Sequence, residues 1–411
     1  AFKSAKAGTY DIWTVSTSGG EPRQLTSMQG REMRPKFSPN GEHIVFEADI
    51  GGTEVRDIFM ISSGGGESTQ LTTHPLDDYG VSFSPDGSLL YFSTQMFWDN
   101  SIAVMDLRTK DIRRLGAAPG GVVSPDGQQI VFTGNEKADD DDQSNTDIYV
   151  MPSSGGEIRL LTPSTLDALD REPAWSPDSK MLAFISDRNG WNNLGVINVA
   201  TGEANMLLQE SFEHGQPRWS PDGKWISFTK NIDYNYHLIR ISVDAGEVLP
   251  ITQLPGVTGG SAVTGQTRGS HLWLSNGSGL VATHSNPSKT SDLWVFSISG
   301  EEARQVTDHQ HPAVSTPSEF AWPELMEYES FDGLEVAGLV YKPQGTARGD
   351  RLPALFFFRA NSNGQHPIQW HPYIQYFVKQ GFLVFAPNFR GSTGRGKHYR
   401  QAVYTHGGDH D

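Results

Sequence analysis

The sequence predicts an all-β seven-bladed propeller, with an incomplete first blade, followed by the beginning of an α/β domain. Three observations support this prediction: a turn motif recurs at intervals of 40 to 55 residues, a second motif starts a strand seven times, and strands and a helix alternate after Thr307. The chain has 411 residues. Because single hydrophobic cores stop growing at about 250 to 300 residues, two domains are expected.

The repeated turn has the sequence Ser-Pro-Asp-Gly or a close variant. Proline presets the backbone for the second position of a type I turn, Asp suits the third, and Gly accepts the left-handed fourth. Apolar runs such as Ile44-Val45-Phe46 and Ile226-Ser227-Phe228 follow the turns. Each turn is therefore predicted to join the first two strands of a blade. The copies begin at Ser38, Ser84, Ser124, Ser176 and Ser220, with a diverged sixth copy at Ser275.

The third strand of each blade begins with an Asp-Ile-aromatic motif or a weaker version of it. A Gly-Gly-Glu turn and a Gln-Leu-Thr sequence follow in several copies and predict the fourth strand. Four strands in about 45 residues is the pattern of a propeller blade. The first blade is expected to lack its first strand and part of its second, because Ala1 to Gly8 align with Ala183 to Gly190. Third strands are predicted near Ile12, Ile58, Ile102, Ile148, Leu194, Leu238 and Leu293.

The repeat stops in a linker from Asp308 to Ser318, and a different pattern follows. Trp370, Tyr373, Ile374, Phe377 and Val378 have the spacing of one helical face, with Gly381 suited to the end of the helix. Apolar strands on both sides of the helix complete a βαβ crossover, which starts a doubly wound sheet. We predict a propeller over residues 1–315 and a partial α/β domain over 320–411. The strands are predicted at Leu325 to Glu329, Leu334 to Tyr341, Pro353 to Phe358, which looks buried, and Phe382 to Ala386.

Composition excludes several classes of function. The net charge of −16 argues against nucleic acid as the main partner, and the chain contains no cysteine for disulfides or thiolate metal sites. No apolar stretch is long enough for a membrane span, so no membrane partner is expected. No feature indicates a metal, a nucleotide or a haem, and no cofactor is predicted. The compartment is not indicated: the sequence has no signal-peptide pattern and fits a periplasmic, secreted or cytoplasmic protein.

Three motifs behind the propeller carry a resemblance to a known family. They are Ser330-Phe331-Asp332-Gly333, Tyr341-Lys342-Pro343, and Asn388-x-Arg390-Gly391-Ser392-x-Gly394-x-Gly396. The chain resembles the prolyl oligopeptidase family of serine peptidases, with the acylaminoacyl-peptidase-like and dipeptidyl-peptidase-like branches nearest. The resemblance implies an α/β-hydrolase domain with a serine nucleophile in a Gly-x-Ser-x-Gly turn, followed in sequence by Asp and His.

The nucleophile turn does not occur in this chain. No serine here has glycine both two positions before it and two positions after it. The resemblance therefore implies a catalytic triad beyond Asp411 and a fragment that is inactive alone. Together with the incomplete first blade, this predicts a chain truncated at both ends.

The resemblance also implies an oxyanion-hole loop after the first long hydrolase strand. The family sequence His-Gly-Gly-Pro is replaced here by Arg359-Ala360-Asn361-Ser362. The backbone N–H groups of Ala360 and Asn361 are the candidate oxyanion-hole donors, because a backbone donor needs no particular side chain. Side chains in place of the paired glycines restrict the turn, so altered or lost activity is the alternative.

Aromatic residues recur in the loops between the second and third strands of three blades. Two interpretations are open: the residues pack against neighbouring blades, or they line a substrate chamber that faces the hydrolase domain. Arg390 likewise has two interpretations, a contact to a substrate carboxylate or phosphate and the anchoring of its own glycine-rich loop. The substrate-chamber candidates are Phe97, Trp98, Trp191, Tyr234, Tyr236 and Arg390.

These observations predict a serine-type peptidase that cleaves short peptides by acyl transfer. The alternative from another class is a propeller that binds a protein or saccharide and carries a silent hydrolase remnant. A third reading keeps the hydrolase and makes the protein an esterase. Short peptides are the expected substrates, and the expected partners are the missing C-terminal catalytic segment or a second copy of the chain.

Overall fold

The computed structural model describes residues 1–97, 99–118, 120–134, 145–162, 168–260, 271–310, 319–359 and 364–403. The chain divides into two compact units, each described by itself below. The first comprises Ala1–Phe184 with Val196–Asn205, and the second comprises Ile185–Gly195 with Met206–Asp411.

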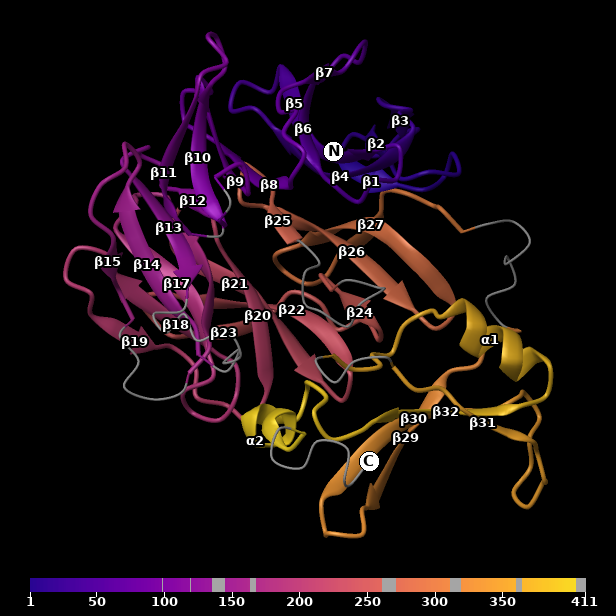
Figure 1. The fold of residues 1–411 in the computed structure, drawn as a ribbon. Helices are drawn as coiled ribbons and strands as arrows, with labels where there is room; N and C mark the ends of the chain where they lie inside the picture. Colours follow the sequence, from indigo (N-terminus) through magenta and orange to yellow (C-terminus); the bar gives the residue numbers. More distant parts are fainter. Residues whose placement is uncertain are drawn as a thin grey trace. The chain divides into compact units, whose positions relative to one another are not determined.

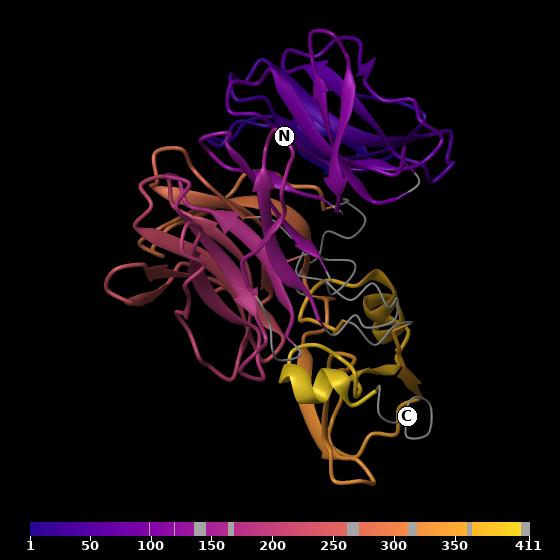
Figure 2. The same ribbon diagram turned by 60° about the vertical axis from the view of Figure 1, so that its left-hand side comes forward.

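The first unit contains antiparallel sheets that follow the predicted repeat (Figure 2). The first sheet has three strands, β1 to β3, and each of the next three has four. The incomplete first blade is thus confirmed. The strands are β1 (Phe2–Ser4), β2 (Asp11–Thr14), β3 (Arg23–Gln24), β4 (Gly30–Phe37), β5 (His43–Ile50), β6 (Asp57–Ser62), β7 (Thr69–Gln70), β8 (Asp78–Phe83), β9 (Leu89–Thr94), β10 (Ser101–Asp106), β11 (Ile112–Ala117), β12 (Val122–Val123), β13 (Gln129–Gly134), β14 (Asp147–Pro152) and β15 (Arg159–Leu160). A fifth sheet has the strands β16 (Asp170–Trp175), β17 (Met181–Ser186), β18 (Asn193–Asn198) and β19 (Ala204–Met206).

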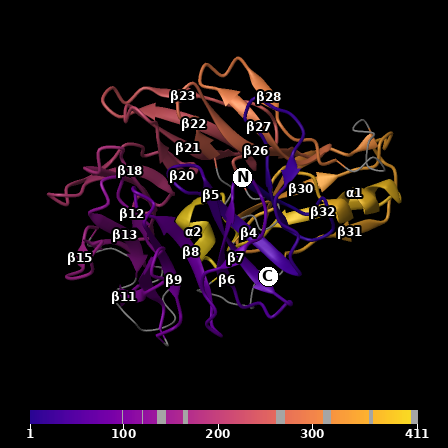
Figure 3. The ribbon, with the colours of Figure 1, turned by 90° about the horizontal axis from the view of Figure 1, so that it is seen from above.

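The last two blades of the repeat belong to the second unit and share one nine-stranded sheet. The short strand β24 joins them, because it pairs in parallel with β22 and antiparallel with β26. Figure 3 shows the strands of these two blades next to one another. The strands are β20 (Glu213–Trp219), β21 (Trp225–Ile232), β22 (Asn235–Ser242), β23 (Val248–Pro250), β24 (Val257–Thr258), β25 (His271–Trp273), β26 (Gly279–Asn286), β27 (Lys289–Ser297) and β28 (Ala303–Gln305).

All seven predicted third strands are present. Each of the seven marker residues named above lies in one of the strands β2, β6, β10, β14, β18, β22 and β27. The predicted boundary between the propeller and the α/β domain, between residues 315 and 320, stays a prediction. Residues 311–318, where most of it falls, lie outside the described ranges.

The remainder of the second unit is a four-stranded sheet with two helices (Figure 1). The sheet order is β29-β30-β32-β31, and the β31–β32 pair is parallel, as a βαβ crossover requires. The predicted helix is confirmed, with Pro372 in its first turn and Gly381 at a φ of 91° after its end. The elements are β29 (Pro323–Glu329), β30 (Glu335–Tyr341), β31 (Ala354–Phe356), α1 (Pro372–Lys379), β32 (Leu383–Asn388) and α2 (Gly396–Gln401).

One detail of the predicted sheet is wrong. The apolar run from Pro353 to Phe358 looks like a buried interior strand, but β31 covers only three of its residues and lies at the edge of the described sheet. Phe356 and Phe358 are 60% and 63% exposed. A continuous apolar run cannot reveal whether a neighbouring strand covers it, and that is why the prediction failed.

Side-chain hydrogen bonds explain why the turn motif recurs. In five copies the serine hydroxyl donates to the Asp or Asn two residues later and accepts the backbone N–H of the residue five positions later. In the copy at Ser220, for example, the hydroxyl lies 2.6 Å from Asp222 Oδ1 and 2.9 Å from the nitrogen of Trp225. The turn therefore closes by local contacts. The matching pairs elsewhere involve Ser38, Ser84, Ser124 and Ser176.

A second repeated hydrogen bond joins the third and fourth strands. The hydroxyl of a threonine in the Gln-Leu-Thr sequence accepts the backbone N–H at the start of the third strand, always fourteen residues earlier. The donor–acceptor distances are 2.8 to 2.9 Å. The pairs are Ile12–Thr26, Ile58–Thr72, Ile148–Thr162, Leu238–Thr252 and Leu293–Thr307.

Five blades have a residue with left-handed backbone four positions before the turn serine, within the first strand in four blades and just before β12 in the fifth. Two of the five are glycines, for which this conformation carries no steric cost. Three carry side chains, and β-bulges accompany two of these, in β4 and β20. The residues are Arg34, Gly80, Gly120, Glu172 and Gln216, with φ between 52° and 74°.

Candidate functional site

The candidate site lies at the carboxyl ends of the parallel pair β31 and β32. Ligands of open α/β sheets bind outside this edge, because the loops that follow the parallel strands converge there. Here the converging segments are Phe357 to Arg359, which follow β31, and Phe389 to Arg395, which follow β32. All contacts described in the next four paragraphs lie within the second unit.

Arg390 anchors the loop after β32. Its guanidinium donates to both carboxylate oxygens of Asp332, at 2.8 and 3.1 Å, and lies 5.8 Å from the centre of the Phe331 ring. The charge and hydrogen bonds of Arg390 hold the pKa of Asp332 at about 2. Asp332 belongs to the Ser-Phe-Asp-Gly motif and Arg390 to the Asn-x-Arg-Gly-Ser motif. This contact therefore joins two of the three motifs in space. The role of Arg390 in binding a substrate stays a prediction.

Tyr234 joins a propeller hairpin to the same loop. It occupies a two-residue turn between β21 and β22, where Asp233 and Tyr234 have φ values of 48° and 65°. Its hydroxyl accepts a hydrogen bond from Arg395 Nε at 3.2 Å, and its carbonyl accepts one from the nitrogen of Ile368 at 2.9 Å. Burial raises the pKa of Tyr234.

Gln365 receives a second propeller contact. Its amide donates to the hydroxyl of Tyr236 at 2.6 Å, and its carbonyl oxygen accepts from Asn231 Nδ2 at 3.1 Å. A Cβ atom on Gly394 would lie 2.2 Å from this oxygen, so no other residue fits there without a shift. The glycine of the family motif thus allows the loop to approach Gln365.

Carboxylates from the propeller segment of the second unit hold α2. Asp187, which is fully buried, forms ion pairs with Arg400 and with Lys397, the latter at 3.6 Å. Glu213 Oε1 accepts the N–H of Gly396 at 3.0 Å. A Cβ atom on Gly396 would lie 3.0 Å from the Trp191 ring and 2.9 Å from the carbonyl oxygen of Gly190.

Four of the predicted chamber residues belong to the second unit, and Phe97 belongs to the first. The four are Trp191, Tyr234, Tyr236 and Arg390. Tyr234 and Tyr236 hydrogen-bond to Arg395 and Gln365, and Trp191 lies next to Gly396 at the start of α2. Phe97 lies in the first unit, where it packs against the core around Phe92 and Met105, and the Arg114 guanidinium lies 5.8 Å from its ring centre. Trp98, Ala360 and Asn361 lie outside the described residues. The chamber and oxyanion-hole assignments stay predictions.

Sequence reasoning missed the polar residues that make these contacts. Asp187, Glu213 and Gln365 belong to no recurring motif, and their partners lie between 129 and 213 residues away in the chain. The one available signal was the close spacing of Gly394 and Gly396, which indicates close approach of another backbone or side chain.

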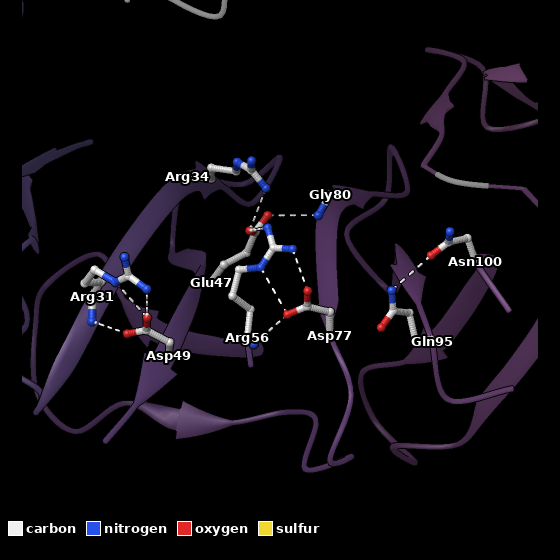
Figure 4. A network of polar contacts seen from close by, with 9 residues as sticks. All are labelled: Arg31, Arg34, Glu47, Asp49, Arg56, Asp77, Gly80, Gln95 and Asn100. Carbon is white, nitrogen blue, oxygen red and sulfur yellow. Dashed lines mark hydrogen bonds and ion pairs between the residues drawn. The ribbon is translucent and has the colours of Figure 1, made fainter. Parts of the chain in front are cut away.

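The first unit contains a separate network of charged side chains (Figure 4). Glu47, which is 1% exposed, accepts the N–H of Gly80 at 2.8 Å and pairs with Arg34 at 2.9 Å and Arg56 at 3.7 Å. Arg56 also pairs with Asp77 at 2.9 Å. Glu47 therefore links β5 to the left-handed glycine of β8. These contacts give the network a structural role, because they join neighbouring strands.

Neither a membrane helix nor a metal cluster is found in the described ranges. No helix there is long and apolar enough to cross a membrane, and no group of three or more His, Asp or Glu side chains is placed to hold a metal ion.

Three family models match parts of the chain. The Tricorn protease N-terminal beta propeller domain matches residues 7–119, and the TolB beta propeller domain matches residues 99–264. The prolyl oligopeptidase family matches residues 369–411, which contain α1, β32 and α2.

Two curated relatives are dipeptidyl peptidases. Dipeptidyl-peptidase 5 of Porphyromonas gingivalis is 24% identical over 294 residues, which cover 68% of this chain and 40% of the relative. The probable dipeptidyl-peptidase 5 of Emericella nidulans is 24% identical over 314 residues, which cover 70% and 41%. The chain thus spans about two fifths of the length of these relatives.

Solved structures show the same fold at low sequence identity. A puromycin-hydrolyzing peptidase of Mycobacterium tuberculosis has a TM-score of 0.79 at 16% identity, with 97% of this chain and 64% of that chain covered. An acylaminoacyl peptidase of Pyrococcus horikoshii has a TM-score of 0.70 at 14% identity, with 98% and 64% covered. These structures show that the chain shares its fold with such peptidases, and the prolyl oligopeptidase family model matches the segment that follows the propeller.

Proposed function

We propose that this protein is a serine peptidase that cleaves short peptides by acyl transfer, and that its nucleophile lies in sequence beyond residue 411. The observation that supports the proposal most is the attachment of propeller loops to the carboxyl edge of the hydrolase sheet. Tyr234 and Tyr236 hydrogen-bond to Arg395 and Gln365, and Glu213 holds the start of α2. Propeller side chains are thereby held against the edge at which this fold builds its reaction centre.

This attachment favours short substrates. The loops that carry Trp191 and Tyr234 contact Gly396 and Arg395, and we infer that they restrict access to the carboxyl ends of β31 and β32. An extended peptide can reach these ends, whereas a folded domain presents no free segment of that kind. The names of the relatives agree with this size class, since they describe removal of dipeptides, hydrolysis of puromycin, and cleavage of acylated amino acids.

The chemical step requires parts of the chain on both sides of residue 411. A serine in a Gly-x-Ser-x-Gly turn would attack the scissile carbonyl, and a histidine would accept its proton. The developing oxyanion would be stabilised by backbone N–H groups after β31, for which Ala360 and Asn361 are the candidates. The 411 residues alone are expected to be inactive, because they contain no such serine turn.

The test is turnover of matched substrates by the protein as purified from its natural source. We expect peptide p-nitroanilides of two or three residues to be hydrolysed, with loss of activity after treatment with a fluorophosphonate. Turnover of p-nitrophenyl esters without turnover of any peptide anilide would make the protein an esterase and overturn the proposal.

A second candidate function follows from the replacement of His-Gly-Gly-Pro by Arg359-Ala360-Asn361-Ser362. Residues with Cβ atoms restrict a turn that paired glycines permit, so a loop that binds peptides without hydrolysing them is the alternative. Saturable binding of the same short peptides, with no turnover and no fluorophosphonate labelling, would favour this silent binding module.

A further inference from the structure

Four side chains around the end of β31 have buried nitrogen atoms that lack a hydrogen-bond partner among the described residues. They are Arg359, His366, Trp370 and His371, and the atoms are Nε and Nη1 of the arginine, Nε2 of His366, Nε1 of the tryptophan and Nδ1 of His371. Buried polar atoms are almost always hydrogen-bonded, because an unpaired one loses its hydration without compensation. Five such atoms on four nearby residues indicate that a partner is missing.

The basic members of this group share one neighbourhood. The rings of His366 and His371 both lie on Phe357, with centroid distances of 5.8 and 4.8 Å. His366 is only 8% exposed, and burial together with the charges of Arg359 and His371 lowers its pKa to about 3. Burial also lowers the pKa of Arg359 to about 10. Both pKa values are lowered because burial disfavours the charged form and no neighbouring carboxylate among the described residues offsets this cost.

Arg359 differs in this respect from the other arginines of the same edge. Arg390, Arg395 and Arg400 are each paired with a carboxylate. Within the described ranges, Arg359 has only the Ser392 hydroxyl, 2.7 Å from Nη2, and the face of the Phe389 ring, 5.4 Å away. A partly buried guanidinium without an anion is costly, and a bound carboxylate would remove that cost.

We propose that Arg359, His366 and His371 form a subsite for a carboxylate of the peptide substrate. The subsite lies at the carboxyl end of β31, on the edge where the reaction centre is proposed. A carboxylate accepts hydrogen bonds only, and this group offers the guanidinium N–H donors of Arg359 and the imidazoles of two histidines. The inference rests on the proposed function, because it names the class of peptide that the same site would accept.

Two kinds of peptide supply this carboxylate: one with its free C-terminus near the scissile bond, and one with an Asp or Glu side chain there. Three dipeptide probes distinguish them. Ala-Phe carries only the C-terminal carboxylate, Ala-Phe-amide carries none, and Ala-Glu-amide carries only the side-chain carboxylate.

The experiment measures binding of the three probes to the 411-residue chain by calorimetry, and the histidine Cε1–H signals by NMR. We expect one or both acids to bind at least about tenfold more tightly than Ala-Phe-amide, since charge-assisted hydrogen bonds are the strong ones. The bound acid should also raise the pKa of His366 and His371. Preference for Ala-Phe identifies the C-terminus, and preference for Ala-Glu-amide identifies the side chain.

The variant R359Q should bind the acids and the amide equally. The matched control is R351Q, which removes an exposed arginine from the segment just before β31 and should keep the preference. If R359Q fails to fold, H371N is measured instead, and it should weaken acid binding. Equal binding of acid and amide by the unaltered chain, or an unchanged preference in the folded variant, would overturn the inference.

These outcomes are separate from the test of the proposed function, because binding needs no nucleophile. Acid-selective binding by a protein that hydrolyses no peptide would leave the subsite in place and refute the peptidase. Peptide turnover without any preference for acids would support the peptidase and refute the carboxylate subsite.

Discussion

Glu47 shows how much a single buried residue contributes to the first unit. Its carboxylate accepts a backbone N–H from β8 and pairs with two arginines, although its side chain is almost completely buried. A buried carboxylate is stable only when its partners replace the lost hydration. Arg34 pairs with Glu47 and has a left-handed backbone conformation, which few residues with a side chain adopt. The ion pair with Glu47 helps to stabilise this conformation.

We expect E47Q to lower the free energy of unfolding of the first unit by about 1 to 3 kcal/mol, because it removes the charged acceptor of the Gly80 N–H and the anion paired with Arg34 and Arg56. Urea unfolding followed by tryptophan fluorescence measures the change. The control E67Q alters an exposed glutamate in a turn and should change stability little. Equal stability of the two variants would show that the network does not hold β5 and β8 together.

The residues of the candidate site were only partly predictable. Trp191, Tyr234 and Tyr236 could be found because aromatic residues recur at matching places in the repeat, and Arg390 because it belongs to a motif. Their partners could not be found. Gln365 and Asp187 are ordinary polar residues in sequence, and only long-range packing makes them partners.

At the scale of the element, the blade is defined by two repeated hydroxyl contacts. The turn serine closes the first hairpin, and the threonine of the fourth strand caps the third strand. Both contacts come from residues close in sequence, so the number of blades and the place of each third strand were predictable. The left-handed residues of the first strands and the bridging strand β24 were not, because they depend on pairing between strands distant in sequence.

We expect T252V to destabilise the second unit by about 1 to 3 kcal/mol, because it removes the acceptor of the buried Leu238 N–H. T252S keeps the hydroxyl and should lose less. Chemical denaturation of both variants gives the difference. A T252V variant as stable as the unaltered chain would contradict the role assigned to this hydrogen bond.

The helix α2 depends on Asp187 for its position. D187N removes the charge that pairs with Arg400 and Lys397, so we expect amide exchange in α2 to accelerate by about tenfold or more. Hydrogen exchange followed by mass spectrometry measures this.

The matched control for α2 is D233N, at an exposed turn position with positive φ, which Asn tolerates as well as Asp. Unchanged exchange in D187N, or equal acceleration in D233N, would contradict the role assigned to Asp187.

At the scale of the whole molecule, the two units differ in their buried titratable groups. The second unit buries His214, His271, His284 and His366, and burial lowers their pKa from 6.5 to about 4, 3, 4 and 3, respectively. In the first unit, burial instead raises the pKa of carboxyl groups, those of Glu32 and Asp78 among them.

These shifts predict opposite responses to acid. Between pH 6.5 and about 4 the unfolded histidines bind protons and the folded ones do not, so the stability of the second unit falls as the pH falls. The loss is at most about 1.4 kcal/mol per pH unit for each histidine. The folded carboxyl groups with raised pKa bind protons more readily than unfolded ones, so they do not oppose folding of the first unit in this range.

We therefore expect acidification from pH 7 to pH 5 to loosen the second unit first. Hydrogen exchange, corrected for the intrinsic rate at each pH, should show lost protection in β21, β22 and β26 while β5 and β9 keep theirs. The variant H284Q should reduce the loss. Equal loss of protection in both units would contradict the prediction.

The proposal that most needs a test is that the nucleophilic serine of this peptidase lies outside these 411 residues. Labelling with a fluorophosphonate, read by intact mass, tests this claim most directly. We predict no stoichiometric adduct on the 411-residue chain of 45.2 kDa, and one adduct per molecule on the protein purified from its natural source, at a Gly-x-Ser-x-Gly serine. A stoichiometric adduct on the 411-residue chain, or none on the natural protein, would contradict it.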